Sequence, residues 1–143
     1  MSNLSPPPII HQVIDNDGFA TVPWTLFFNN LYEGDTGTSW SPTFENLTEV
    51  GTPTITGSYR FISQELVFFR VRIVPATSTT SAAGSTAINN FPLQIAQDGI
   101  VFAVSGLTGS ASGMVSQSDQ KIYTPAWAAV TVPLTIIGFA EVV

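Results

Sequence analysis

The segment Leu66–Val74 constrains the fold most, because its apolar residues repeat with a period of two. A β-strand would place alternate residues on opposite faces. One face would carry only large apolar side chains, namely Val67, Phe69, Val71 and Ile73. The other face would be apolar at one end and cationic at the other, through Leu66, Phe68, Arg70 and Arg72. The segment therefore predicts a central strand of an all-β domain, with a buried face and a second face that contacts something else.

A second strand is predicted over 54–62, and only Ser63, Gln64 and Glu65 separate it from Leu66. So short a connection favours an antiparallel hairpin. Gly57 inside this strand indicates a bulge or a close approach of another group. For the second face of 66–74 we expect a neighbouring subunit. We expect Arg70 and Arg72 to meet Glu45, Glu49 or an acidic residue of that subunit.

From Trp40 onward the chain is predicted to consist of strands and turns. Further strands are expected over 43–50, 100–105, 114–117, 121–123 and 131–143, with two short ones in 86–95. Low-complexity or glycine-rich loops are expected over 75–85 and 106–113, and an irregular segment over 125–130. Strands at intervals of about 8–12 residues favour a sandwich or barrel. We expect a jelly-roll-like antiparallel β-sandwich of about eight strands as a body over 40–143.

The first 35 residues differ from this body. A Pro- and Ser-rich tail precedes a predicted helix over Pro23–Tyr32, which Thr21 can cap. Helical spacing gives this segment one apolar stripe, formed by Trp24, Phe27, Phe28 and Leu31. So short a helix needs a partner surface. Two alternatives stay open: the stripe docks on the sheet of its own chain, or it forms a bundle with other copies. We expect residues 1–35 to serve attachment and oligomerisation.

Composition narrows the functional classes. Charged residues make up 10% of the chain, against about 25% in an average soluble domain, which is typical of a surface covered in an assembly. The net charge is −6 and the chain has four Lys and Arg residues, too few to follow a nucleic-acid backbone. No cysteine is present, which excludes thiolate zinc sites and cysteine nucleophiles. Pro125 and Pro133 interrupt the uncharged stretch 122–140, so we expect no membrane insertion.

Catalytic chemistry is not indicated. His11 is the single histidine and lies in the Pro-rich tail, so neither a catalytic triad nor a metal or cofactor site is predicted. Glu45 and Glu49 would lie about 13 Å apart along a strand, too far for a glycosidase pair. Sugar stacking is a possible role for four aromatic residues, each of which can instead pack in the core or an interface. These residues are Trp40, Tyr59, Tyr123 and Trp127.

The sequence also resembles a known class of proteins. The resemblance rests on 23–31 (PWTLFFNNL), 40–44 (WSPTF), 50–60 (VGTPTITGSYR) and the ending 136–143 (IIGFAEVV). These segments are similar to small virion proteins of tailed bacteriophages, of the short fibre, spike or head-decoration type. The resemblance implies a non-enzymatic homotrimer located in the virion, with an N-terminal segment attached to tail, portal or capsid proteins.

Two alternatives to the fibre stay open. One is a capsid decoration protein that clamps neighbouring coat subunits. The other is a carbohydrate- or receptor-binding module that contacts a host-surface glycan through the loops 77–86 and 105–113 and through exposed Trp or Tyr.

Overall fold

The computed structural model describes residues 37–105 and 108–143 of the chain. This part is built of β-strands and contains no helix. The predicted helix Pro23–Tyr32, with the stripe Trp24, Phe27, Phe28 and Leu31, lies outside the described residues, as does His11. Residues Thr38–Val143 form one compact unit.

Twelve strands are present in the described ranges, and all their pairings are antiparallel. They are β1 (Thr38–Trp40), β2 (Phe44–Glu45), β3 (Thr48–Val50), β4 (Thr54–Phe61), β5 (Leu66–Val74), β6 (Ser78–Ser81), β7 (Ala87–Ile88), β8 (Gly99–Ser105), β9 (Thr108–Ser116), β10 (Lys121–Tyr123), β11 (Trp127–Val130) and β12 (Leu134–Glu141). Nine of them form one sheet in the order β1-β4-β5-β12-β8-β9-β10-β7-β2, and β11-β6-β3 form a second.

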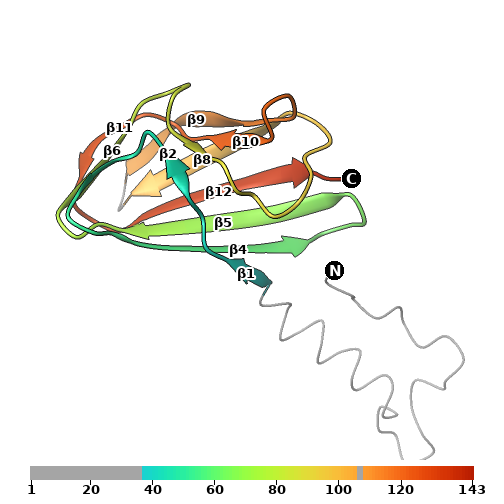
Figure 1. Ribbon diagram of the computed structural model, residues 1–143, viewed down its shortest axis with the longest axis horizontal. Helices are drawn as coiled ribbons and strands as arrows, with labels where there is room; N and C mark the ends of the chain where they lie inside the picture. Colours follow the sequence, from blue (N-terminus) through green and yellow to red (C-terminus); the bar gives the residue numbers. More distant parts are fainter. Residues whose placement is uncertain (1–36, 106–107) are drawn as a thin grey trace, which may run out of the picture. The chain divides into compact units, whose positions relative to one another are not determined.

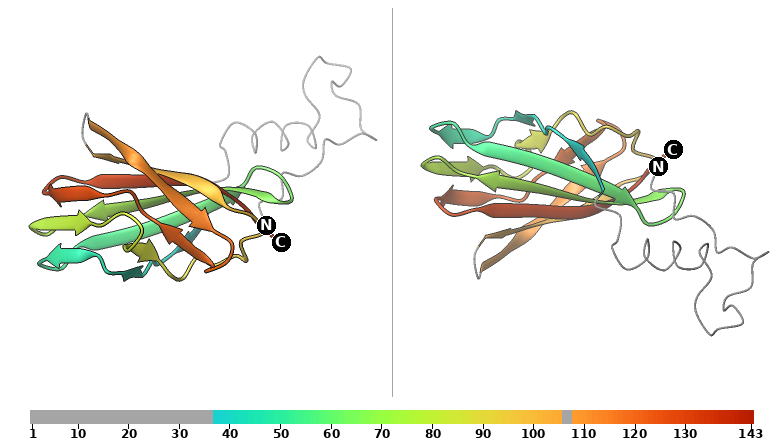
Figure 2. Two further views of the ribbon diagram at one scale, coloured as in Figure 1. Left: turned by 90° about the horizontal axis from the view of Figure 1, so that it is seen from above. Right: turned by 90° about the horizontal axis from the view of Figure 1, so that it is seen from below.

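The nine-stranded sheet curls into a half-barrel (Figures 1 and 2). Its edge strands are β1 and β2, yet only Ser41, Pro42 and Thr43 separate them in the chain. Four residue steps span at most about 14 Å, so the two edges must lie close together. Asn90 stabilises this connection, because its side chain accepts a hydrogen bond from the Thr43 backbone N–H and donates one to the Ser41 carbonyl.

Strand β5 lies near the centre of the sheet, with β4 on one side and β12 on the other. Its bounds are those predicted, and the β4–β5 hairpin is confirmed. The face predicted to be buried is fully buried: the exposed fractions of Val67, Phe69, Val71 and Ile73 are all 0%. The final strand β12 is also central, between β5 and β8. The concave side of the curled sheet therefore forms the core.

The predicted strand over 43–50 is wrong as a single element. Asn46 has a φ of 55°, a left-handed conformation that interrupts a strand. The chain therefore divides into β2, which pairs with β7 in the large sheet, and β3, which pairs with β6 in the small one. The side chain of Asn46 donates a hydrogen bond to the Ser85 carbonyl, which fixes the position of this break.

Three segments expected to be irregular contain strands. The Thr- and Ser-rich segment 75–85 contains β6, residues 106–113 contribute to β9, and 125–130 contains β11. Polar side chains of β6 point inward because they find partners there. The Ser81 hydroxyl donates to the Pro125 carbonyl at 2.7 Å, and the Thr79 hydroxyl accepts from the indole of Trp127. Composition alone does not reveal such pairing.

The all-β, antiparallel architecture is thus as predicted, with more strands than the eight expected. The arrangement seen is one curled sheet with a small second sheet, and a jelly-roll sandwich is not confirmed by it.

Candidate assembly surface

The outer face of the large sheet is the most unusual surface of the body. Cross-strand register aligns its side chains in rows, because directly paired residues point to the same side. One row contains Arg70 of β5, Ile137 of β12 and Phe102 of β8. In the next row Phe68 of β5 pairs with Phe139 of β12, and their ring centroids are 5.5 Å apart. Large side chains therefore cover several neighbouring strands.

Many of these apolar side chains are open to solvent. The exposed fractions are 59% for Ile100, 49% for Phe102 and 50% for Phe139. We define the outer apolar face as the side chains of β5, β8, β9 and β12 on this side: Phe68, Ile100, Phe102, Val104, Met114, Ile137 and Phe139. Contiguous apolar patches of this kind on a soluble domain mark interaction sites.

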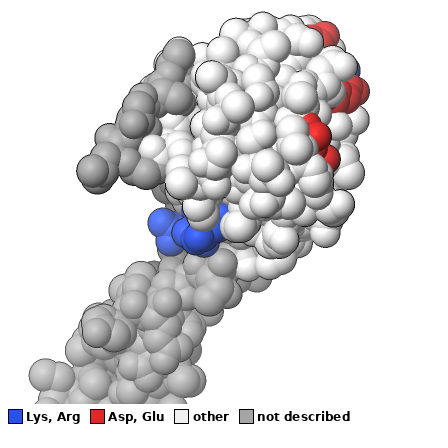
Figure 3. Space-filling view, turned by 90° about the vertical axis from the view of Figure 1, so that its left-hand side faces the viewer, with Lys and Arg blue, Asp and Glu red and all other residues white. Residues whose placement is uncertain are grey.

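Three of the chain's four cations border this face, on β4 and β5. The guanidinium of Arg60 lies 5.5 Å from the ring centroid of Phe68, a cation–π contact. Arg70 and Arg72 are exposed on the same side. Figure 3 shows the main group of blue side chains at one place, apart from the red acidic ones. The outer face is therefore apolar over β12, β8 and β9 and cationic over β4 and β5.

The expected partners of these arginines are not found within the body. Glu45 forms an ion pair with Lys121 at 2.8 Å instead. Within residues 37–105 and 108–143, no carboxylate lies in ion-pair distance of Arg70 or Arg72. Of the two expectations, only an acidic residue of another subunit stays a prediction.

The predicted interface residues of β5 do share one face, as expected. Leu66 and Phe68 are half-buried, and Arg70 and Arg72 are exposed. The rows on β8, β9 and β12 were missed. Their signal is in the sequence, since Ile100–Val104 and Leu134–Ala140 are almost continuously apolar. Such runs are typical of strands that are covered on both faces.

The proposed sugar-stacking aromatics separate into three environments. Trp40 and Tyr59 pack with Phe91 at the core's edge, with centroid separations of 5.6 Å (Trp40–Phe91) and 6.1 Å (Tyr59–Phe91). Trp40 is paired with Gly57, whose missing side chain makes room for the indole, so the predicted close approach at Gly57 is confirmed. These two rings are therefore occupied by aromatic packing.

The expectation that Trp127 is available for sugar stacking is wrong. This residue is buried in the core, with 8% exposed, and its indole N–H donates to the Thr79 hydroxyl at 3.4 Å. Its ring therefore has no free face on which a sugar could stack. Tyr123 is half-exposed on β10 and lines a pocket. The Tyr123 hydroxyl donates to an Asp119 carboxylate oxygen at 2.8 Å.

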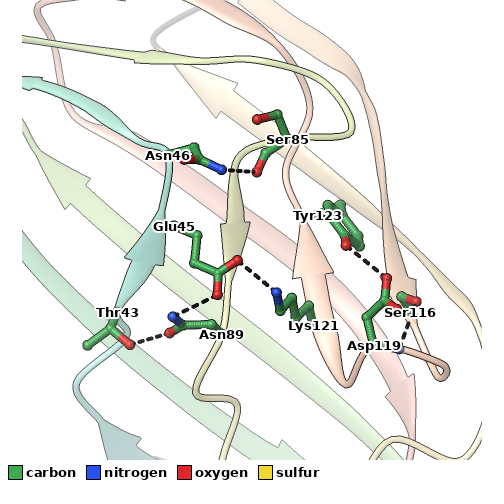
Figure 4. A network of polar contacts seen from close by, with 9 residues as sticks. All are labelled: Thr43, Glu45, Asn46, Ser85, Asn89, Ser116, Asp119, Lys121 and Tyr123. Carbon is green, nitrogen blue, oxygen red and sulfur yellow. Dashed lines mark hydrogen bonds and ion pairs between the residues drawn. The ribbon is translucent and has the colours of Figure 1, made fainter.

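A polar network joins β2, β7 and β10 at the far end of the sheet (Figure 4). The hydrogen-bonded ammonium of Lys121, and then the Asn89 amide, lower the pKa of Glu45 below its ordinary 4.5. Glu45 in turn raises the pKa of Lys121 above 10.5. The hydrogen bond to Asp119, followed by burial, raises the pKa of Tyr123 above 10.0. These shifts follow from local pairing of exposed groups and indicate no catalytic arrangement.

Comparisons with protein-family models, curated proteins and solved structures give no match. Among the described residues, no group of three or more His, Cys, Asp or Glu side chains is placed to hold a metal ion. The same residues include no helix of the length and apolarity needed to cross a membrane.

Proposed function

We propose that this chain is a non-enzymatic structural subunit of a tailed-bacteriophage virion, a homotrimeric short fibre or appendage anchored by its N-terminal segment. The observation that carries the proposal is the outer apolar face. Phe102, Phe139 and Ile100 have exposed fractions of 49% to 59%, in a chain with few charges to keep such a surface soluble.

Self-association accounts for this face in physical terms. Burying it against another copy removes apolar area from water at about 25 cal/mol per Å². The arginines on β4 and β5 border the apolar rows and remain available for acidic groups of a neighbour. In a cyclic trimer, one surface patch of each copy contacts a different patch of the next copy. The ring closes when the rotation between neighbouring copies is a third of a full turn.

The virion location and the attachment of residues 1–35 to tail, portal or capsid proteins rest on the sequence resemblance. The jelly-roll class is part of the same proposal, supported by the placement of the last strand, β12, between β5 and β8. A decoration protein would instead clamp neighbouring coat subunits through the same N-terminal segment. Copy number per particle separates the two, because a fibre occupies a few sites and a decoration protein covers the capsid.

Light scattering after size-exclusion chromatography tests the assembly. Wild-type protein is expected at three times the chain mass of 15.3 kDa. Phe102→Glu places a charge in the middle of the outer apolar face and is expected to give a monomer, because an unpaired charge is costly to bury.

Ile62→Glu is the matched control. Ile62 is as exposed as Phe102 but lies in the turn after β4, off the sheet face. This variant is expected to keep the wild-type mass. A monomeric wild-type protein, or a Phe102→Glu variant that assembles like wild type, would contradict the proposal.

A further inference from the structure

A pocket of about 380 Å³ lies over β9 and β10, beside the turn that follows β6. Its volume is in the usual range for small-molecule sites, about 300–1,000 Å³. Tyr123 and Asp119 supply polar atoms, and Met114 and Ala83 supply apolar walls. At the rim, Gly84 has a φ of 69° and no atom within 4 Å of where a Cβ would be. Glycine suits this left-handed position and leaves that part of the rim without a side chain.

The polar groups of the pocket are held in place before any ligand arrives. One carboxylate oxygen of Asp119 accepts the Tyr123 hydroxyl at 2.8 Å. The Asp119 backbone N–H donates to the hydroxyl of Ser116, which anchors the turn (Figure 4). Asp119 is exposed, so its carboxylate remains accessible to further donors. Because this acceptor and the aromatic ring are already held in position, little conformational entropy would be lost when a ligand binds.

The lining chemistry excludes several ligand classes. No lysine or arginine lines the pocket in the part of the chain that the structure describes, so an anionic ligand would find no counter-charge. A single carboxylate is too few oxygen ligands for calcium or magnesium. A cationic ligand would meet a single exposed carboxylate, and ion pairs with exposed carboxylates contribute little to binding. The remaining class is a neutral molecule with hydroxyl donors and apolar faces.

We propose that this pocket binds a neutral saccharide. Sugar hydroxyls would donate to the Asp119 carboxylate, and the apolar side of the pyranose ring would pack on Tyr123 and Met114. Such charge-assisted hydrogen bonds are roughly twice as strong as neutral ones. An aromatic ring with a polar edge suits the mixed surface of a sugar. All the lining residues belong to one chain, and Met114 is also a residue of the outer apolar face, so the pocket adjoins the surface proposed for assembly.

Glycan-array screening of the full-length protein tests the site, followed by saturation-transfer NMR with the best binder and with free glucose, galactose, mannose and N-acetylglucosamine. Asp119→Asn keeps the shape of the side chain, removes its charge and is expected to weaken binding roughly tenfold. Tyr123→Ala is expected to abolish binding. Glu49→Gln removes an exposed carboxylate from β3 and should leave binding unchanged.

Urea unfolding and light scattering accompany each variant. If Tyr123→Ala fails to fold, Asp119→Asn still tests the site, because it keeps the volume of the side chain. The proposal is overturned if no saccharide binds at millimolar concentration, or if both pocket variants bind as wild type. It is also overturned if butylammonium competes with the glycan, which would indicate a cation site. Trimer mass is measured in the same samples, so loss of assembly and loss of sugar binding are separately visible.

Discussion

The indole of Trp40 packs directly over Gly57, and this contact joins the edge strand β1 to the core. A Cβ built on Gly57 would lie 2.8 Å from the Trp40 ring and 2.7 Å from Pro42. The Trp40 ring cannot move easily, because it also contacts Tyr59 and Phe91. The absence of a side chain at residue 57 is therefore a packing requirement.

Gly57→Ala is expected to destabilise the body by about 1–3 kcal/mol, the usual cost of overpacking a filled core. Urea unfolding followed by tryptophan fluorescence measures it, and Ser58→Ala on the same strand is the control, expected within about 0.5 kcal/mol of wild type. A stability equal to wild type for Gly57→Ala would show that Trp40 can be displaced without cost.

The Glu45–Lys121 pair predicts a pH dependence. Because the folded-state pKa of Glu45 is below 4.5, its contribution to stability is present above pH 4.5 and is lost as the pH falls through the lowered pKa. The pKa values of Lys121 and Tyr123 are raised, so their contributions are present below about pH 10 and are lost above it.

Unfolding free energies measured from pH 3 to pH 6 test the acidic limb. Glu45→Gln should flatten the fall in stability below the ordinary pKa of 4.5, while Glu49→Gln should leave it unchanged. An identical acid profile for wild type and Glu45→Gln would mean that the ion pair contributes nothing measurable, as exposed pairs often do.

At the scale of elements, strand β5 has one face in the core and the other on the outer face of the sheet. Phe69 is fully buried on the concave side, where its ring contacts Phe91, and Gly138 of β12 leaves room for it. Phe68, the adjacent residue, lies on the outer face against Phe139 and Arg60. Substitutions at these two neighbouring phenylalanines therefore test the core and the outer face separately.

Phe69→Ala is expected to cost about 3–5 kcal/mol in unfolding free energy, because it leaves a cavity in the core. Phe68→Ala should cost less than half as much, and should instead weaken self-association. Urea titrations at one fixed protein concentration, together with light scattering, separate the two effects. Equal losses of stability would indicate that the outer face is packed as tightly as the core.

The sequence predicts β5 well because its alternating apolar residues all lie on a fully buried face of the sheet. The same reasoning fails for β6, whose inward-facing Thr79 and Ser81 are polar, and for its partner strand β11. Their burial depends on Trp127 and Pro125, residues more than 40 positions away, which no local pattern reports. The break between β2 and β3 depends on one left-handed asparagine, a conformation that composition does not specify.

The candidate site was predictable in part. The second face of β5 was identified from the side chains of Leu66, Phe68, Arg70 and Arg72. Its extension across β12, β8 and β9 required the order of strands, since β12 lies between β5 and β8 in the sheet but is distant from both in the chain. Tyr123 was a candidate among four aromatics, and only the fold shows that it lines a pocket beside Asp119.

At the scale of the whole molecule, the outer face combines an apolar area with a cationic border, and these two parts respond differently to salt. Raising the ionic strength from about 0.1 M to about 1 M shortens the screening length from about 10 Å to about 3 Å, which weakens exposed arginine contacts. Apolar burial is not weakened in this way. We therefore expect the trimer mass to persist in 1 M NaCl and to be favoured further by sulfate.

Light scattering across a salt series measures this, with a variant carrying Arg70→Gln and Arg72→Gln as the comparison. This double variant is expected to assemble like wild type at every salt concentration, because the apolar rows supply most of the association energy. Dissociation of the wild-type protein in 1 M NaCl, or a monomeric double variant at low salt, would instead assign the association to the arginines. The partner surface would then have to be acidic rather than apolar.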